Sequence, residues 1–211
     1  MNLARMISRI RCHRGGEIRP REPLRRRLQI TGCILGALVA LVGDRPVSAQ
    51  SNPLSEYEVK AAFLYHFAQF VEWPPETFKE AGNPLVYCTI GEDPFHGSLD
   101  AALNGKTIGA RSLHVRHLKQ PSELQGCHVV FLGEKEKRLF STVLELLKGS
   151  PVLIVGESEH FVQGGGTIGF FLEENKIRFE INLEAAEKAR LRISSRLLAL
   201  AKTVVGNPRG T

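Results

Sequence analysis

Residues 152–181 read VLIVGESEHFVQGGGTIGFFLEENKIRFEI, and this stretch decides the fold class. Its opening run, Val152–Val155, is continuously apolar, which is typical of a strand covered on both faces of a parallel sheet. Residues 167–172 and 176–181 read as two further strands, and the Glu173-Glu174-Asn175 segment between them is a hairpin signal. The stretch therefore predicts a parallel strand followed by an antiparallel pair.

Upstream of this stretch, strand and helix signals alternate along the chain. Strand-like apolar runs lie at residues 85–90, 113–118 and 127–132, and amphipathic helical patterns lie at residues 99–103 and 134–148. Alternating strands and helices are typical of an α/β fold with a parallel sheet between helical layers. We therefore predict a three-layer α/β sandwich with a mostly parallel, Rossmann-like sheet and a C-terminal antiparallel hairpin.

A helical pattern precedes the first strand. Ser55 is expected to cap this helix, which runs to about Glu72. Lys60 lies on its polar face. Its apolar face has residues at three- and four-residue spacing, namely Val59, Ala62, Phe63, Phe67, Phe70 and Val71.

Two more helices are expected after the hairpin. Asn182 can cap the first of them, which ends at about Ala189. Ser194 or Ser195 can cap the second. The apolar residues of this last helix are Leu197, Leu200, Ala201 and Val204.

Met1–Ala49 carries the excess positive charge of the chain. The whole protein has a formal net charge of +6; this segment contains ten Arg and three acidic residues, and the remainder contains 18 basic and 19 acidic residues. The segment has an Arg-rich start, an apolar core at Ile30–Val42 and the small-x-small site Val47-Ser48-Ala49. We therefore predict a signal peptide over residues 1–49, cleaved after Ala49, and a single domain over residues 50–211.

Export would place the mature domain in a bacterial periplasm. The apolar core of the leader has about 13 residues, shorter than the roughly 20 that a membrane-spanning helix needs, so a retained anchor is the less favoured alternative. After cleavage the chain is not expected to span the membrane. Because the mature domain carries no basic stripe with interleaved aromatic residues, nucleic-acid binding is not expected either.

The mature domain keeps two cysteines, Cys88 and Cys127. An even number of cysteines in an exported protein favours a disulfide, and two buried free thiols are the alternative. In the doubly wound strand order the first and third predicted strands are neighbours, so a bridge between these two residues is geometrically reasonable.

The sequence offers no constellation typical of an enzyme. Ser158 lacks the Gly-x-Ser-x-Gly pattern of a nucleophilic serine. His114 and His117 are three residues apart on a predicted strand, so they point to opposite faces and form a poor metal site. We therefore expect no catalytic residues, no bound metal and no cofactor.

Two groups of residues are candidates for binding. The loops after the first and fourth predicted strands are expected to meet at the carboxyl edge of the sheet, where open α/β sheets bind ligands. A tentative small-molecule pocket there comprises Glu92, Asp93, Phe95, Glu157 and Ser158. Simple turn chemistry is the alternative for these loops.

The second group lies on the last predicted strand of the hairpin. Arg178, Glu180 and Asn182 alternate along it and share one face. Charged residues in this position form either a partner-binding surface or an internal salt bridge, and the sequence does not decide between the two.

Several segments, taken together in order, resemble the YfiR family of periplasmic proteins. The run EVKAAFLYHF at 58–67, followed by VEWP at 71–74, is similar to the opening helix of that family. Further matching stretches are IGEDPF at 90–95, GES at 156–158, RFEIN at 178–182 and ISSRLL at 193–198. The resemblance covers about residues 56–205.

This resemblance implies regulation and no enzymatic activity. YfiR-like proteins are periplasmic repressors that bind the sensing domain of an inner-membrane diguanylate cyclase, which lowers cyclic-di-GMP signalling and biofilm formation; the family also forms homodimers. Cys88 and Cys127 match the position of one family disulfide, whereas a second cysteine pair found in some members is absent here. The rival hypothesis is a periplasmic small-molecule-binding module that feeds a sensor kinase or another membrane receptor.

Overall fold

Four neighbouring strands of an eight-stranded sheet run parallel to one another. The computed structural model describes residues 53–80 and 82–206, and in it these strands are β2 (Leu85–Ile90), β4 (Arg111–Leu118), β5 (Val129–Leu132) and β6 (Leu153–Gly156). The order across the sheet is β10-β8-β7-β6-β5-β2-β4-β3. The first long strand, β2, thus lies between the second and the third, which is the doubly wound order predicted from the sequence.

The predicted antiparallel hairpin follows the parallel strands. It consists of β7 (Ile168–Glu173), which is parallel to β6, and β8 (Lys176–Asn182), which is antiparallel to β7. The turn residues Glu174 and Asn175 both have positive φ values, 50° and 59°, as a two-residue hairpin turn requires.

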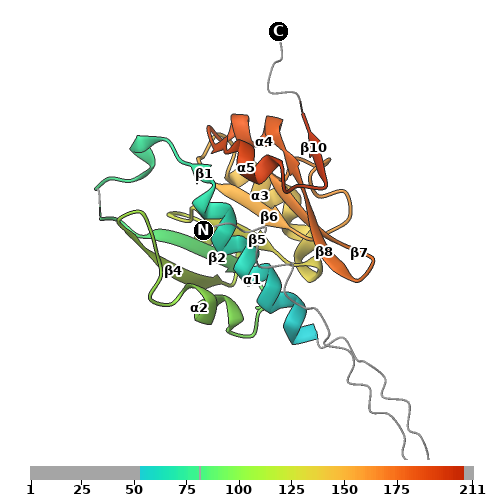
Figure 1. The fold of residues 1–211 in the computed structure, drawn as a ribbon. Coiled ribbons are helices and arrows are strands. Elements are labelled where there is room, and N and C mark those ends of the chain that lie inside the picture. Colours follow the sequence, from blue (N-terminus) through green and yellow to red (C-terminus); the bar gives the residue numbers. More distant parts are fainter. Residues whose placement is uncertain (1–52, 81, 207–211) are drawn as a thin grey trace, which may run out of the picture. The chain divides into compact units, whose positions relative to one another are not determined.

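Helices cover both faces of the sheet, which confirms the three-layer α/β architecture (Figure 1). The apolar core on one face includes residues of α1 (Pro53–Gln69), α2 (Ser98–Leu103), α4 (Leu183–Lys188) and α5 (Ser195–Leu198). The core on the other face includes residues of α3 (Phe140–Leu146). Shorter 3₁₀ segments are η2 (Pro75–Thr77), η3 (Pro121–Glu123) and η4 (Glu134–Leu139), so the helix expected at 134–148 is divided into η4 and α3.

The first helix differs from the prediction in its bounds and in its buried face. It begins at Pro53 and ends at Gln69, because residues 71 and 72 form a short strand, β1 (Val71–Glu72), paired with β9 (Arg192–Ile193). Val59 is 45% exposed and Lys60 only 5% exposed, the reverse of what we expected. The fully buried residues of the helix are Ala61, Leu64, Phe67 and Ala68.

The last predicted helix was wrong beyond its first turn. α5 ends at Leu198, and Val204 lies instead in the edge strand β10 (Thr203–Val205), which is parallel to β8. The Lys202 N–H donates to the Phe179 carbonyl, so the sheet edge provides the backbone partner that a longer helix would have provided. At the opposite edge, the short strand β3 (Thr107–Ile108) pairs with the start of β4.

Cys88 of β2 and Cys127, just before β5, form the predicted disulfide, with Cα atoms 5.9 Å apart. The bridge therefore joins neighbouring strands near the middle of the sheet. None of the described helices has the length and the apolar composition needed to cross a bilayer. The predicted signal peptide, residues 1–49, lies outside the described residues.

Candidate functional site

The carboxyl ends of β2, β5 and β6 surround a small polar hollow. In a doubly wound sheet the chain leaves β2 and β5 in opposite directions, which opens a crevice between the loops that follow these strands. Here the crevice is a cavity of about 140 Å³, which we call the carboxyl-edge cavity. It is lined by Tyr57, Glu92, Pro94, His96, Gly133, Glu134, Lys135, Glu136 and Glu157.

Lys60 and Glu157 form an ion pair behind this cavity. Their side chains are only 6% and 7% exposed. Lys60 contacts Oε2 of Glu157. The other oxygen, Oε1, accepts a hydrogen bond of 2.9 Å from the Tyr57 hydroxyl and one of 3.0 Å from the Glu134 N–H. Both oxygens of this buried carboxylate therefore have protein partners, and the pair joins α1 to the loop after β6.

Tyr57 is held in its neutral form. Burial raises the pKa of its hydroxyl, and the adjacent Glu157 carboxylate raises this pKa further. The Lys60 ammonium lies 4.5 Å from the centroid of the Tyr57 ring, and the ring packs edge-on against Phe95 with centroids 5.4 Å apart. At neutral pH Tyr57 is thus a hydrogen-bond donor and not a base.

The rim of the cavity is charged and exposed. The Lys135 ammonium lies 2.8 Å from a Glu92 carboxylate oxygen, and this hydrogen bond lowers the pKa of Glu92. The Glu136 carboxylate accepts the Glu92 N–H over 3.3 Å. It reaches that position because Gly91 has no side chain: a Cβ on Gly91 would collide with the carboxylate, and Gly91 also has a φ of 81°.

The structure brings together two of the five residues predicted for the pocket. Glu92 and Glu157 line the same cavity. Asp93 instead accepts the Phe95 N–H over 3.0 Å and the Gly97 N–H over 3.2 Å, and Phe95 is buried in the core. Ser158 does not line the cavity.

Sequence reasoning missed the contributions of α1 and of the loop after β5. Tyr57 and Lys60 are three residues apart and so lie on one face of α1, which was the available signal. Their partner Glu157 is about 100 residues away, and no local pattern links them.

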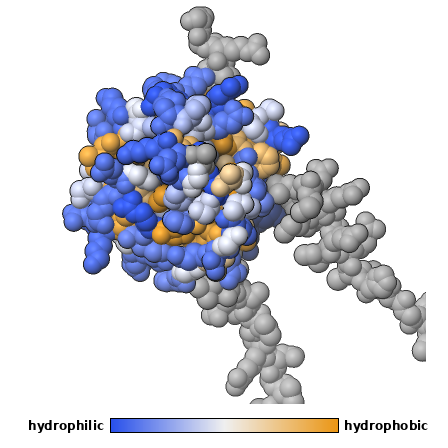
Figure 2. Space-filling view, turned by 90° about the vertical axis from the view of Figure 1, so that its left-hand side faces the viewer, coloured by the Kyte–Doolittle hydropathy of each residue, from blue (hydrophilic) through white to orange (hydrophobic). Residues whose placement is uncertain are grey.

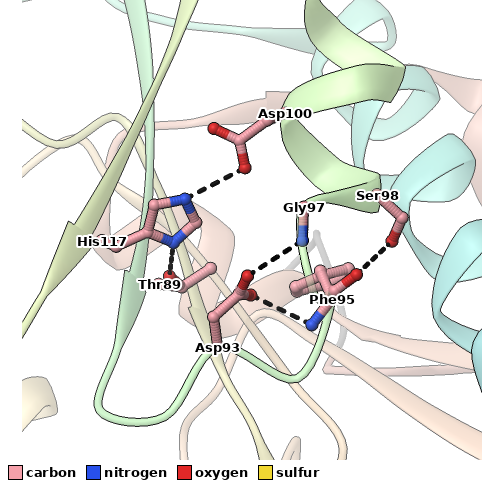
Figure 3. Close-up of polar contacts among 7 residues, drawn as sticks. All are labelled: Thr89, Asp93, Phe95, Gly97, Ser98, Asp100 and His117. Atoms are coloured by element: carbon pink, nitrogen blue, oxygen red, sulfur yellow. Dashed lines mark hydrogen bonds and ion pairs between the residues drawn. The ribbon is translucent and has the colours of Figure 1, made fainter.

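A second polar cluster lies where β2 and β4 end (Figure 3). The register of these parallel strands places Thr89 opposite His117. The Thr89 hydroxyl lies 2.8 Å from Nδ1 of His117, and Nε2 of the same ring lies 3.0 Å from the Asp100 carboxylate. The Asp93 carboxylate completes the group; we call Asp93, Asp100 and His117 the His117 cluster.

The three residues predicted as a partner surface share one face of β8, as expected, but differ in their contacts. Arg178 forms an ion pair of 3.7 Å with Glu173 of β7 and keeps 47% of its side chain exposed. Glu180 lies 3.4 Å from the Gln163 side-chain nitrogen. Asn182 caps α4 by accepting the Ala185 N–H over 2.9 Å, so the predicted cap is confirmed.

A shallow groove also lies between α2 and β4. Its apolar lining includes Val86, Leu113 and Val115. Both elements lie on the left-hand side of the molecule in Figure 1. Figure 2 looks onto that side, where hydrophobic side chains are gathered between hydrophilic ones.

The carboxyl-edge cavity is small and lined mostly by charged residues. Its lining contains four glutamates, one lysine and one histidine, and no serine, threonine or cysteine. The volume of about 140 Å³ is below the roughly 300–1,000 Å³ of typical small-molecule sites. Fold and site therefore define an α/β domain in which ion pairs join the loops at the carboxyl edge of the sheet to one another and to α1.

The comparison with known families identifies this domain. Residues 57–202 match the YfiR/HmsC-like family, and the chain belongs to that family. The resemblance noted in the sequence is thus confirmed, and the family is regulatory rather than catalytic.

Two solved structures show weaker similarity. One is a conserved domain protein from Vibrio cholerae O1 biovar El Tor strain N16961, with 11% identity and a TM-score of 0.47; the match covers 71% of this chain and 60% of that one. The other is the ABC domain in complex with L-Trp from Streptococcus pneumonia, with 10% identity and a TM-score of 0.42; the match covers 57% of this chain and 55% of that one. This chain thus spans less than two thirds of either.

Proposed function

We propose that this protein is a periplasmic regulator that binds the periplasmic sensing domain of an inner-membrane diguanylate cyclase and represses it. Repression lowers cyclic-di-GMP production and biofilm formation. The observation that carries this proposal is the family match, which runs from α1 nearly to β10 and so includes almost every described element. The predicted signal peptide supports the periplasmic location.

The hairpin of β7 and β8 is the surface that we propose for the cyclase. Arg178 is half-exposed there, and Lys202 forms a second ion pair with Glu173, of 2.9 Å. Leu172, on the same hairpin, is 57% exposed. The strand register pairs Leu172 with Ile177 and Arg178 with Phe171, so the leucine and the arginine lie on opposite faces of the hairpin. The arginine face, with its exposed charges, is the one that we propose meets the partner. Asn182 contributes by holding α4 in place rather than by contact.

A homodimer is the expected state of the repressor. Each copy would then present its own hairpin to a membrane partner. The molar mass of the purified mature chain, measured by light scattering over a concentration series, tests this part separately.

A small-molecule-binding module is the second candidate, and the carboxyl-edge cavity is the observation that favours it. Against it stands the set of protein partners around Glu157: among the described residues that line the cavity, no buried side-chain polar atom lacks a hydrogen-bond partner. A ligand that fits this cavity would raise the melting temperature in proportion to the logarithm of its concentration.

The test of the proposed function is the cyclic-di-GMP level of the host. Deleting the gene should raise it, and the wild-type gene supplied in trans should restore it. Arg178→Ala should fail to restore it although the protein accumulates in the periplasm, whereas Lys188→Ala, which removes an exposed ion pair on α4, should restore it. An unchanged cyclic-di-GMP level after deletion would contradict the proposal.

A further inference from the structure

Three side chains with metal-ligating atoms converge beside the carboxyl end of β4. They come from the loop after β2 (Asp93), from α2 (Asp100) and from β4 itself (His117), as Figure 3 shows. One ligand atom from each lies within 4.8 Å of the other two. The cluster is therefore made by the fold and not by a local sequence motif.

The imidazole of His117 is oriented by a buried hydroxyl. Thr89 is 1% exposed, and its Oγ1 lies 2.8 Å from Nδ1 of His117. With Nδ1 at this hydroxyl, Nε2 of the ring faces the Asp100 carboxylate. In a metal-binding histidine one ring N–H donates to an acceptor and the other nitrogen directs its lone pair at the ion; the Thr89 hydroxyl can serve as that acceptor.

The contacts of His117 fit two arrangements of its ring proton: in one, the Nε2–H donates to Asp100 and Nδ1 accepts the Thr89 hydroxyl; the other leaves Nε2 free to bind a metal ion. When the Nδ1–H donates to Thr89, the Nε2 lone pair faces the Asp100 carboxylate over 3.0 Å. Either a proton or a metal ion between these atoms removes the repulsion. The 3.0 Å separation is close to the roughly 3.3 Å between two ligands of a tetrahedral zinc ion with bonds of about 2.0 Å.

Asp93 has free coordination capacity although both of its oxygens already accept hydrogen bonds. Each oxygen accepts one backbone N–H, from Phe95 or Gly97, and a carboxylate oxygen has two lone pairs. These bonds hold the carboxylate beside the imidazole. Asp100 already lies 3.0 Å from Nε2 of His117, so closing the cluster onto one ion requires the Asp93 carboxylate to approach this pair.

We propose that Asp93, Asp100 and His117 form a binding site for a divalent transition-metal ion of the zinc type. One imidazole nitrogen and two carboxylate oxygens suit zinc and its neighbours better than calcium or magnesium, which prefer oxygen ligands alone. Three protein ligands leave a coordination position for water, and the side chains of His117 and Asp100 are 40% and 48% exposed. The ion would join the loop after β2 and α2 to β4. The sequence-based expectation of no metal rested on His114 with His117, whereas this site uses His117 with two aspartates.

The test uses the mature chain, from Gln50, with any affinity tag removed, stripped with a chelator and titrated with zinc chloride. Calorimetry should show one zinc ion per chain, and the melting temperature should rise by about 5 °C at a hundredfold excess over Kd. His117→Gln and Asp100→Asn should each weaken binding about 100-fold, and Thr89→Val, which removes only the orienting hydroxyl, about tenfold. His114→Gln, the matched histidine three residues away on β4, should bind zinc as the wild type does.

Cobalt(II) gives a second readout that a structural role of these residues would not produce. Its visible absorption bands should change on binding to the wild type and to His114→Gln, but not on mixing with His117→Gln. The idea fails if the folded wild type shows no saturable binding of zinc or cobalt up to millimolar concentration. It also fails if His117→Gln and Asp100→Asn, with unchanged circular dichroism, bind as tightly as the wild type. In either case the contact between His117 and Asp100 is an ordinary hydrogen bond within the protein.

Discussion

Lys60 and Glu157 are 97 residues apart in the sequence and form an ion pair that is almost completely withdrawn from solvent. The pair fastens α1 to the loop after β6, at the edge of the sheet where the carboxyl-edge cavity opens. Lys60 also pairs with Glu56, one helical turn before it, over 2.5 Å. The buried charges are tolerated because they are paired and because Tyr57 and the Glu134 backbone complete the hydrogen bonds of the Glu157 carboxylate.

Lys60→Met should therefore destabilise the domain strongly. It leaves the Glu157 carboxylate buried without its counter-charge, which costs about 3–5 kcal/mol of unfolding free energy. Urea unfolding followed by circular dichroism measures the loss. The double variant Lys60→Met/Glu157→Gln should recover part of it, since the only carboxylate left without Lys60 is then Glu56, whose side chain is 31% exposed.

Lys137→Met is the matched control for this substitution. Lys137 pairs with Glu134 over 2.7 Å, but their side chains are 63% and 51% exposed. Removing an exposed pair of this kind should leave the urea midpoint unchanged. Equal effects of Lys60→Met and Lys137→Met would show that the Lys60–Glu157 pair is not buried in solution.

The disulfide should contribute measurably to stability. Cys88 and Cys127 are separated by 39 positions, and closing a loop of that length stabilises the folded state by about 3–4 kcal/mol in the chain-entropy model. Cys88→Ala/Cys127→Ala should lose about that amount. A reducing agent should lower the melting temperature of the wild type but not of the double variant. Free thiols in the unreduced mature chain, measured with a thiol reagent after unfolding, would contradict the bridge.

His128 should make stability fall as the pH is lowered. Burial, and then the charge of Arg111, lower the pKa of His128 from 6.5 to about 4, and its Nδ1 accepts the Val86 N–H over 3.1 Å. Between these two pKa values the unfolded chain binds a proton at His128 that the folded chain does not. The contribution of neutral His128 to the unfolding free energy is therefore fully present above pH 6.5 and is lost as the pH falls toward 4.

The expected loss is about 1–2 kcal/mol after allowance for the partly exposed ring. His128→Asn keeps an acceptor for the Val86 N–H but cannot titrate, so its unfolding free energy should fall less between pH 7.5 and pH 4.5 than that of the wild type. Carboxylates titrate in both proteins, and the difference between the two curves isolates His128. Parallel curves would mean that His128 is not shifted.

Asn182 and Arg178 should separate a structural role from a partner role on the same strand face. Asn182→Ala removes the cap of α4 and a 2.7 Å hydrogen bond to the Val162 carbonyl, so it should cost about 1–2 kcal/mol. Arg178→Ala removes only a half-exposed ion pair and should change the unfolding free energy by less than about 1 kcal/mol. If Arg178→Ala lowered the melting temperature as much as Asn182→Ala does, the internal salt-bridge interpretation would replace the partner surface.

The long strands could be predicted because their burial is written into local sequence. Val152–Val155 is apolar throughout, and in the structure β6 is buried on both faces. The short strands β1, β3, β9 and β10 contain only two or three residues each, too few to show a period of two. Their pairing depends on chain segments that meet only in the folded domain.

Only those residues of the carboxyl-edge cavity whose position follows from the strand order could be predicted. Glu92 and Glu157 follow strands whose carboxyl ends share one edge, so their meeting could be expected from the strand order. Lys60 was assigned to the solvent face because a lysine is rarely buried, and its burial is favourable only with Glu157 beside it. The histidine nearest to His117 in the sequence is His114, whereas the neighbours of His117 in space are Asp93 and Asp100, which no local pattern indicates.

The central claim is that this domain binds a membrane-bound cyclase. Affinity capture tests it most directly: the tagged mature chain, from Gln50 onward, is incubated with solubilised membranes of its own host, and the retained proteins are identified by mass spectrometry. The account predicts recovery of an inner-membrane protein that carries a diguanylate cyclase domain, with much less of it retained by Arg178→Ala than by Lys188→Ala. Repeated, sensitive captures that retain no membrane signalling protein would contradict the account.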